Sequence, residues 1–345
     1  WIPLHLRDNL SFLHILGIAA SNLTPSILWM VAPAFFEPLS TKLHISKMWK
    51  TLILFGASLS GFIVGPLAGV YSDACAFKYG RRRIYMAISV FLLLIGMLMM
   101  CYCYEIGQFF QPDNPLALQK FLFGFSYEFV MIAGSIMYIP ARSLCSDVCP
   151  LHQQNLMANI CSFFAGFGGV IINVIGGFKL FEYTPLNQEQ FMLIISGILC
   201  VISTIISIIV TPEEPLTIKP SCVNPFKETL KAIKIMPKPI RRVLPSMLFS
   251  QIAYFEFSLQ FNHFMGHDIF KGDNSDPNQF DMVKRYNDGV AWSMFCGAMR
   301  YLSQSIFGIV NPPLIDKFGY KWNTFFGYFC MTIGEALFFI VDNKC

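Results

Sequence analysis

Ionisable side chains lie within long apolar segments of this sequence, where such groups are normally rare. The residues concerned are Glu37, Glu128, Arg142, Glu256, His263, Arg300 and Glu335. A charge near the centre of a membrane helix costs at least about 2.5–3.5 kcal/mol, so it usually faces a partner or a water-filled cavity. We therefore regard these residues as candidates for binding a polar solute, for carrying protons or for pairing with one another.

Arg142 is the strongest candidate for contact with a polar solute. Its planar guanidinium offers five fixed donors to hydroxyl groups or to a carboxylate. The alternative role is an interfacial anchor near one end of its helix. Glu256 and His263 are seven residues apart, which is two helical turns on one face. His263 is a candidate proton-linked group because histidine titrates near physiological pH; the alternative is a hydrogen-bonded histidine near the outer surface. Arg300 can pair with one of the acids.

The elements that must position these residues are helices long enough to cross a bilayer. The 345 residues are 54% hydrophobic and 13% charged, with a mean hydropathy of +0.53, unlike ordinary soluble domains. A crossing takes about 20 apolar residues, and repeated apolar runs exclude a single signal peptide. The sequence predicts an all-α membrane protein with nine helices, at 11–36, 50–72, 84–107, 118–146, 156–178, 191–210, 243–265, 288–310 and 322–342.

A basic segment that contains several prolines, 211–242, separates six expected helices from three. We predict an N-terminal six-helix bundle at 1–210, a cytoplasmic linker at 211–242 and a partial C-terminal bundle at 243–345, with the chain truncated at both ends. Residues 225–235 are expected to form a short amphipathic helix on the membrane surface. An inside-first orientation puts fourteen Lys and Arg in cytoplasmic segments against nine on the opposite side, as the positive-inside rule favours.

Catalysis, metal binding and nucleic-acid binding find little support. The eleven cysteines are odd in number and most lie in apolar runs, so no disulfide framework follows. Cys145 and Cys149 lack a partnering His or Cys at metal-ligand spacing. No catalytic motif is present, and the basic residues are spread over loops. We expect no enzyme activity, no cofactor, no metal and no nucleic-acid partner, with the lipid bilayer as the surroundings of the chain.

Two expected cytoplasmic loops share a pattern of acid, glycine and base. Its members are Gly69, Asp73, Gly80, Arg81, Arg82 and Arg83 in the first loop, and Asp316, Gly319 and Lys321 in the second. Each loop places an acid at a helix exit, then a glycine turn, then a base at the next helix. We interpret the pair as corresponding loops of two related halves. The alternative is that any tight hairpin favours glycine and bases, and that the arginines enforce orientation.

Small and aromatic residues add two further expectations. Glycines recur at four-residue spacing along the second expected helix and crowd the fifth, at Gly166, Gly168, Gly169, Gly176 and Gly177. Such residues let membrane helices approach closely. Aromatic side chains near Trp29, Tyr127 or Tyr138 are candidates to stack on a ring of the solute.

The first loop resembles the signature loop of the major facilitator superfamily, which reads Gly-x-x-x-Asp, a short turn, then Gly-Arg-Arg or Gly-Arg-Lys. Longer stretches are similar to plant sucrose transporters and animal proton-associated sugar transporters. These stretches are Ser60 to Arg83, Pro140-Ala-Arg142-Ser-Leu-Cys-Ser-Asp147 with Ala158-Asn159, and Phe264-Met265-Gly266 with Phe270-x-Gly272 and Tyr286-Asn-Asp-Gly289-Val290. They cover the second, fourth, fifth, seventh and eighth expected helices.

The resemblance implies a major facilitator fold of two six-helix bundles. It also implies proton-coupled symport of sucrose or a related saccharide by alternating access, with the sugar and protons as partners. By the same resemblance Arg142 is required for transport, and Asp73 with the loop bases holds one face closed. The alternatives are a carrier of another small organic solute, or a non-transporting sensor or scaffold. We expect an integral multi-pass protein of the plasma membrane or an organelle membrane.

Two positions depart from the family pattern. The relatives carry an acid just before the Phe264 position and another eleven residues before Arg142, where this chain has His263 and Met131. Glu128 lies three residues before Met131, on the same helical face. It is therefore the candidate replacement as a proton carrier; the alternative is a buried acid paired for structure.

Overall fold

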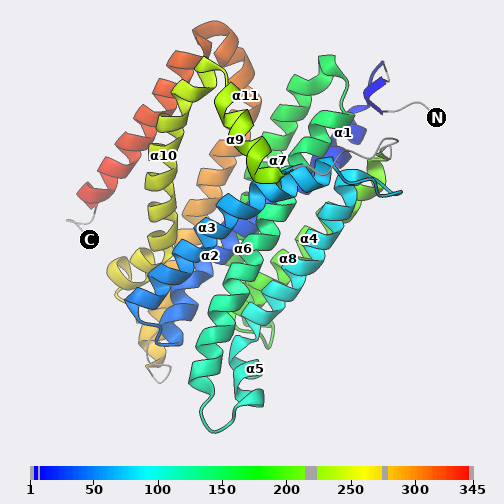
Figure 1. Cartoon of the computed structure of the whole chain (residues 1–345). Coiled ribbons are helices and arrows are strands. Elements are labelled where there is room, and N and C mark those ends of the chain that lie inside the picture. Colours follow the sequence, from blue (N-terminus) through cyan, green and yellow to red (C-terminus); the bar gives the residue numbers. More distant parts are fainter. Residues whose placement is uncertain (1–3, 7, 214–223, 274–278, 342–345) are drawn as a thin grey trace.

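The computed structural model describes residues 4–6, 8–213, 224–273 and 279–341, and these form helices joined by short loops (Figure 1). The α-helices are α1 Phe12–Ala19, α2 Leu23–Lys42, α3 Lys47–Asp73, α4 Arg81–Cys101, α5 Cys103–Phe110, α6 Pro115–Val148, α7 Gln154–Gly177, α8 Gln188–Val210, α9 Pro225–Ile235, α10 Lys238–His263 and α11 Phe280–Val341. A π-helical turn, Phe264–Ile269, continues α10. The described ranges contain no strand, in agreement with the predicted all-α class.

Six helical segments of the described chain are long and apolar enough to cross a membrane. They are Phe12–Lys42, Lys47–Asp73, Arg81–Cys101, Pro115–Val148, Leu151–Gly177 and Gln188–Val210. The first combines α1 and α2, because the 3-10 turn Ala20–Asn22 connects them directly. These six segments agree in order and position with the first six helices that hydropathy predicts.

The predicted number of nine helices is wrong for the described residues. The first expected helix is divided into α1 and α2, and the third is divided at Tyr102 into α4 and α5. The short helix predicted at 225–235, which was not among the nine, is present as α9 within the expected linker. The last two expected helices are the arms of α11, which bends at Gly319 with φ 76°. Hydropathy locates apolar runs, whereas these divisions depend on backbone torsions at single residues.

Local side-chain chemistry explains where several helices begin. The Ser11 hydroxyl accepts a hydrogen bond from the His14 N–H at 3.3 Å at the start of α1. Asn187 and Gln190 form a capping box at the start of α8, which satisfies two otherwise unpaired backbone groups. Gly80 precedes α4 with φ 120°, a backbone conformation that favours glycine.

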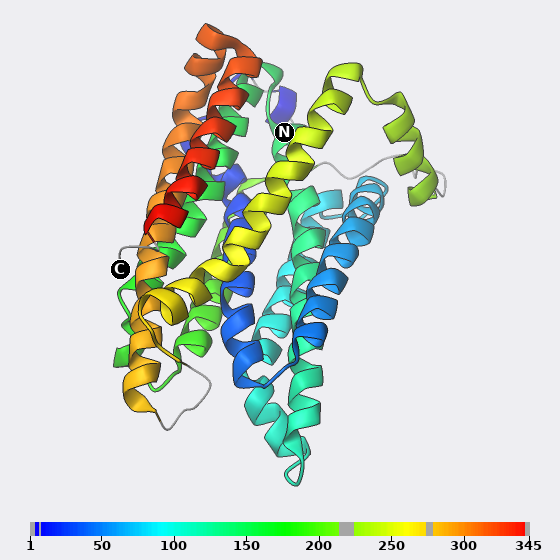
Figure 2. The same ribbon diagram turned by 90° about the vertical axis from the view of Figure 1, so that its left-hand side faces the viewer.

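We call α1–α8 the first half and α10–α11 the second half. The glycines of α7 bring the two halves into close contact. A Cβ atom added to Gly166 would lie 2.8 Å from the Tyr301 carbonyl oxygen, and one added to Gly177 would lie 2.7 Å from the Phe295 ring. The backbone of α7 therefore packs directly on α11, as small residues permit. Figure 2 shows both arms of α11 on the α7 side of the molecule, opposite α3 and α4.

Candidate functional site

A cavity of about 700 Å³ lies between the two halves, and we call it the large cavity. Helices α2, α6 and α7 of the first half and α10 and α11 of the second half line it. The lining residues are Asn22, Pro25, Ser26, Trp29, Pro33, Met131, Tyr138, Arg142, Ser162, Ala165, Ser250, Gln251, Tyr301, Gln304, Tyr328 and Met331. Neutral polar groups and aromatic faces thus surround a single arginine.

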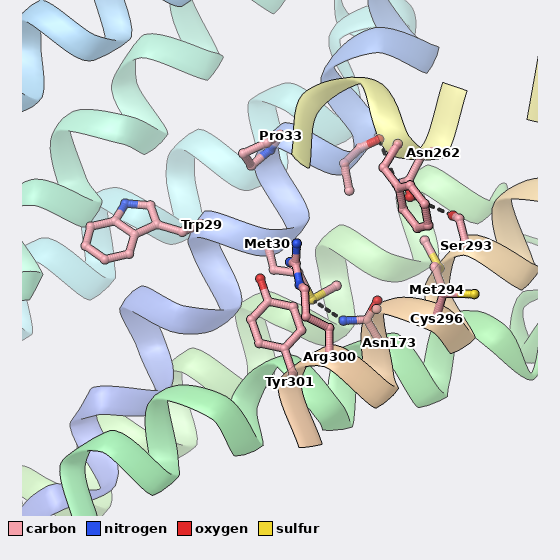
Figure 3. Close-up of a pocket in the computed structure, with 13 residues that line it drawn as sticks. Trp29, Met30, Pro33, Asn173, Asn262, Ser293, Met294, Cys296, Arg300 and Tyr301 are labelled. Atoms are coloured by element: carbon pink, nitrogen blue, oxygen red, sulfur yellow. Dashed lines mark hydrogen bonds between the residues drawn. The ribbon is translucent and has the colours of Figure 1, made fainter. Parts of the chain in front are cut away.

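A second cavity of about 190 Å³, the small cavity, adjoins the first (Figure 3). The two cavities share Trp29, Pro33 and Tyr301. Asn262 of α10 crosses between the halves in its wall. The Asn262 amide donates to the Ala34 carbonyl of α2 at 3.4 Å and accepts from the Ser293 hydroxyl of α11 at 2.6 Å. This side chain therefore joins three helices next to the small cavity.

Aromatic rings and guanidinium groups are adjacent in both cavities. The ring centroids of Trp29 and Tyr138 are 4.8 Å apart with an interplanar angle of 50°. The guanidinium carbon of Arg142 is 5.8 Å from the Tyr138 ring centroid, and that of Arg300 is 4.6 Å from the Tyr301 ring centroid. Cation–π contacts of this kind hold a guanidinium against the face of an aromatic ring.

The structure places two of the predicted site residues at these cavities. Arg142 lines the large cavity and Arg300 lines the small one. Trp29 and Tyr138, predicted as stacking residues, also line the large cavity, whereas Tyr127 is fully buried, 4.7 Å from the Phe36 ring centroid. Among the described residues that line either cavity there is no carboxylate.

The other predicted residues lie elsewhere. The Glu128 carboxylate is directed at Gly56 of α3 and lines neither cavity, and the described residues give it no hydrogen bond or ion pair. His263 Nδ1 is 3.4 Å from the Tyr286 hydroxyl, and the His263 ring stacks on His267 at 5.3 Å. The side chain of Glu256 lies outside the described residues. Neither Glu128 nor His263 thus lines a cavity.

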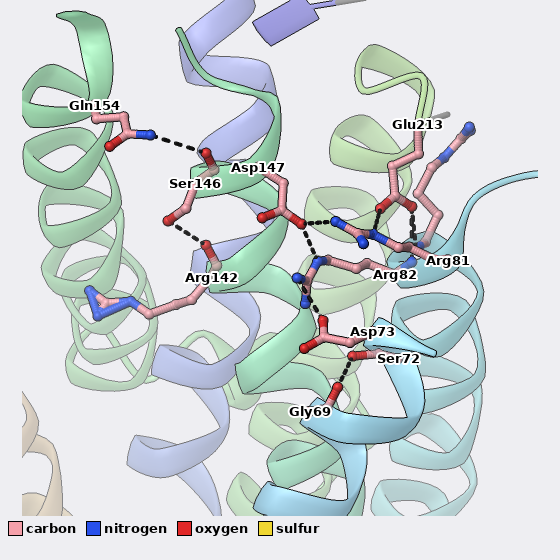
Figure 4. A network of polar contacts seen from close by, with 11 residues as sticks. Gly69, Ser72, Asp73, Arg81, Arg82, Arg142, Ser146, Asp147, Gln154 and Glu213 are labelled. Carbon is pink, nitrogen blue, oxygen red and sulfur yellow. Dashed lines mark hydrogen bonds and ion pairs between the residues drawn. The ribbon is translucent and has the colours of Figure 1, made fainter. Parts of the chain in front are cut away.

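An ion-pair cluster forms at the end of the first half that carries Arg81, and we call this the cytoplasmic end, following the charge distribution (Figure 4). Arg82 is buried and binds Asp73 and Asp147, each at 2.7 Å. Arg81 Nη2 binds the same Asp147 oxygen at 2.6 Å. The cluster therefore connects α3, α4 and α6, and no described residue of the second half takes part.

Glu213, just beyond α8, completes this cluster, although the sequence pattern did not single it out. Its Oε2 atom accepts hydrogen bonds from the backbone N–H groups of Arg82 at 2.9 Å and Arg83 at 3.1 Å. A carboxylate at this position caps α4 and interacts favourably with its helix dipole. A Cβ atom on Gly80 would lie 2.6 Å from Glu213 Oε2, so glycine is required there for close approach as well as for its torsion angle.

The second of the two loops predicted to correspond, which contains Asp316, Gly319 and Lys321, is arranged differently. Gly319 supplies the bend of α11 with φ 76°, but Asp316 and Lys321 are exposed. Within the described part of the chain, no ion pair joins these two residues to each other or to the first half. The two loops therefore correspond in sequence and in having a glycine turn, but they do not form corresponding ion pairs.

Comparison with known proteins gives consistent matches. A sequence model of the Major Facilitator Superfamily matches residues 17–343. The chain is 25% identical to sucrose transport protein SUC4 of Arabidopsis thaliana, over 90% of this chain and 64% of the relative. It is 22% identical to the general alpha-glucoside permease of Schizosaccharomyces pombe, over 74% of this chain and 48% of the relative. The chain thus spans less than two thirds of the length of either relative.

A mouse protein and a solved structure extend these matches. The mouse membrane-associated transporter protein is 20% identical over 91% of this chain and 70% of its own length. The crystal structure of a D-xylose–proton symporter superimposes with a TM-score of 0.53 at 16% identity, covering 89% of this chain and 70% of that one. At this identity the structural match supports the fold alone. The resemblance inferred from the loop motifs is confirmed as a distant relationship to plant sucrose transport proteins.

Proposed function

Since the chain belongs to the Major Facilitator Superfamily, a family of multi-pass membrane transporters rather than enzymes, we propose that it carries a sugar across the membrane by alternating access. One observation carries this proposal: a cavity of about 700 Å³, bounded by both halves, in which Arg142 faces neutral polar and aromatic groups. Solute sites of such carriers form near mid-membrane between the halves.

The positions of the lining residues along their helices support an inward-facing arrangement. Arg142, Asn22 and Ser162 of the large cavity lie nearer the cytoplasmic ends of their helices than Asn173 and Asn262 of the small cavity do. The small cavity is therefore the deeper of the two, viewed from the cytoplasm. In our proposal the solute leaves through the large cavity.

Contacts between the halves near the other end of the molecule fit the same arrangement. Lys179, at the end of α7, forms an ion pair with Asp288 near the start of α11. Asn262, in the wall of the small cavity, donates a hydrogen bond to the α2 backbone. We propose that these contacts keep the outer side closed while the cytoplasmic side is open, and that they separate in the outward-facing state.

A sugar suits the chemistry of the lining better than a purely apolar solute. Arg142, Gln251 and Gln304 offer several donors and acceptors to hydroxyl groups. The faces of Trp29 and Tyr138 are suited to the apolar C–H face of a sugar ring. The names of the relatives, a sucrose transport protein and an alpha-glucoside permease, favour sucrose or a related glucoside.

Proton coupling is a separate part of the proposal. It rests on the family resemblance, since the described lining holds no carboxylate. The proton carrier would be Glu128 or His263, which lie outside the cavities in this structure, or Glu256, whose side chain is outside the described residues. Coupling through either of the first two requires them to reach the cavity in another state of the cycle.

The proposal is tested with full-length protein reconstituted in vesicles. Labelled sucrose, maltose and xylose are supplied at acidic external pH, and accumulation is measured with and without a protonophore. We expect Arg142→Ala to lower uptake more than tenfold, and Arg142→Lys to restore only part of it because lysine lacks the planar fork. Arg285→Ala, at an exposed arginine that lines neither cavity, is the matched control.

Each result decides a different part of the proposal. Accumulation of none of these sugars, with uptake of another organic solute, would contradict the sugar assignment. Normal uptake by Arg142→Ala would contradict the role of the large cavity. Accumulation that persists with the protonophore would contradict proton coupling while leaving facilitated sugar transport intact.

A further inference from the structure

The short helix α9, Pro225–Ile235, has two faces of opposite character and lies outside the transport cavities. Phe226, Leu230 and Ile233 follow the i, i+4, i+7 spacing of one helical face. These side chains are 59%, 60% and 54% exposed, although all three are large and apolar. Nothing in the described chain covers this face.

The adjoining face of α9 is basic. Lys227, Lys231 and Lys234 repeat the same spacing one residue later, and all three are exposed. The single acid of the helix, Glu228, lies 3.9 Å from Lys231 in an exposed pair, which neutralises little of this charge. Lys238, Arg241 and Arg242 continue the basic surface onto the first turns of α10 and are exposed as well.

Local interactions define the start of α9 but do not account for its stability. The Asn224 side chain accepts hydrogen bonds from the N–H groups of Phe226 at 3.1 Å and Lys227 at 3.3 Å. Proline occupies the first helical position, where its missing N–H is not needed. Helices shorter than about 12 residues are marginal in water even with good caps. A helix of 11 residues therefore needs a surface to pack on.

The position of α9 indicates which surface is available. It contacts α3, and Figure 2 shows it beside the cytoplasmic end of that helix, outside the bundle. Only 17% of the apolar stretch of α3 is buried within the protein, the lowest fraction among the six membrane-spanning segments of the described chain. Since α3 is one of the membrane-spanning segments, its Asp73 end lies at a bilayer surface. The uncovered apolar face of α9 thus lies where the bilayer meets the cytoplasm.

We propose that α9 docks on the anionic cytoplasmic leaflet, with Phe226, Leu230 and Ile233 in the acyl region and the lysines on acidic headgroups. Amphipathic helices with a basic face bind such interfaces by burying apolar side chains and by electrostatic attraction to anionic headgroups. The cytoplasmic leaflet carries negative surface charge, and each nearby base strengthens binding about fivefold. The proposal does not depend on which solute is transported.

The test measures hydrogen exchange of residues 225–235 in the full-length protein in lipid nanodiscs. One set contains phosphatidylcholine alone and the other contains phosphatidylcholine with phosphatidylserine. We expect strong protection of α9 only with phosphatidylserine. The variant Lys227→Gln/Lys231→Gln/Lys234→Gln keeps good helix formers and should lower that protection by up to about 100-fold, the product of three fivefold effects.

A matched variant controls for net charge. Lys47→Gln/Lys271→Gln/Lys284→Gln removes three exposed lysines from the opposite side of the membrane and should leave α9 protection unchanged. Equal protection of α9 in both lipid mixtures would overturn headgroup recognition. Exchange without protection in either mixture would overturn docking, and protection that rises with protein concentration would assign the face to a second copy of the chain instead.

Discussion

Replacement of Glu213 gives the most direct test of how the cytoplasmic end of the first half is held together. Its carboxylate is almost fully buried, with 5% of the side chain exposed, and it accepts two backbone hydrogen bonds at the start of α4. We expect Glu213→Ala to destabilise the protein and Glu213→Gln to do so less, because the amide retains an acceptor but loses the charge.

The expected loss in the free energy of unfolding follows from the contacts of Glu213. A side-chain cap is worth about 1 kcal/mol, and a negative charge at a partly buried helix start adds about 1–2 kcal/mol. The Arg81 contact adds little, because its N–O distance is 3.9 Å. Glu213→Ala should therefore lose about 2–3 kcal/mol, and Glu213→Gln about half of that.

The assay is thermal unfolding of purified protein in detergent at a fixed scan rate. At about 2 °C or more per kcal/mol, Glu213→Ala should lower the apparent Tm by about 5 °C. Glu182→Gln, at an exposed acid after α7, is the control. The reasoning would be refuted if Glu213→Ala unfolded at the temperature of the unmodified protein, or if the control variant fell by the same amount.

Three further predictions concern contacts between the halves. Gly169→Ala places a Cβ atom in steric overlap with the Tyr301 ring of α11, so we expect a loss of about 1–3 kcal/mol in thermal unfolding, whereas Gly327→Ala, with open space around it, should cost nothing. Lys179→Asp should slow solute exchange in vesicles, and adding Asp288→Lys should restore the rate by re-forming the ion pair; failure of the double variant would argue against a paired role. Asn262→Ala removes two hydrogen bonds beside the small cavity and should raise the KM about fivefold, with an unchanged KM as the contrary result.

The membrane-spanning segments of the first half follow from hydropathy because each apolar run is long and ends at polar residues. The ion pair between Asp73 and Arg82 can also be predicted from the sequence, since the two residues are nine positions apart across one tight loop. The contribution of Glu213 cannot be predicted in this way, because Glu213 and Arg82 are 131 positions apart in the sequence. Only the folded bundle brings the end of α8 to the start of α4.

Side-chain direction within the membrane helices was the least predictable property. Glu128 and Arg142 both lie on α6, yet one is directed at α3 and the other lines the large cavity. A helix that is apolar on nearly all sides carries little information about which face meets lipid and which meets protein. The same limit applies to His263, the last residue of α10, whose contact with Tyr286 joins α10 to α11.

The glycine face of α7 restricts how this protein can be recombined with its relatives. Where the α7 backbone lies against α11, the α7 side has no side chain that can be trimmed or enlarged to absorb a mismatch. A chimera that takes its first half from this chain and its second from a relative should therefore assemble only if α7 and the first arm of α11 are exchanged as a unit. Loops and peripheral helices such as α9 should be interchangeable without that constraint.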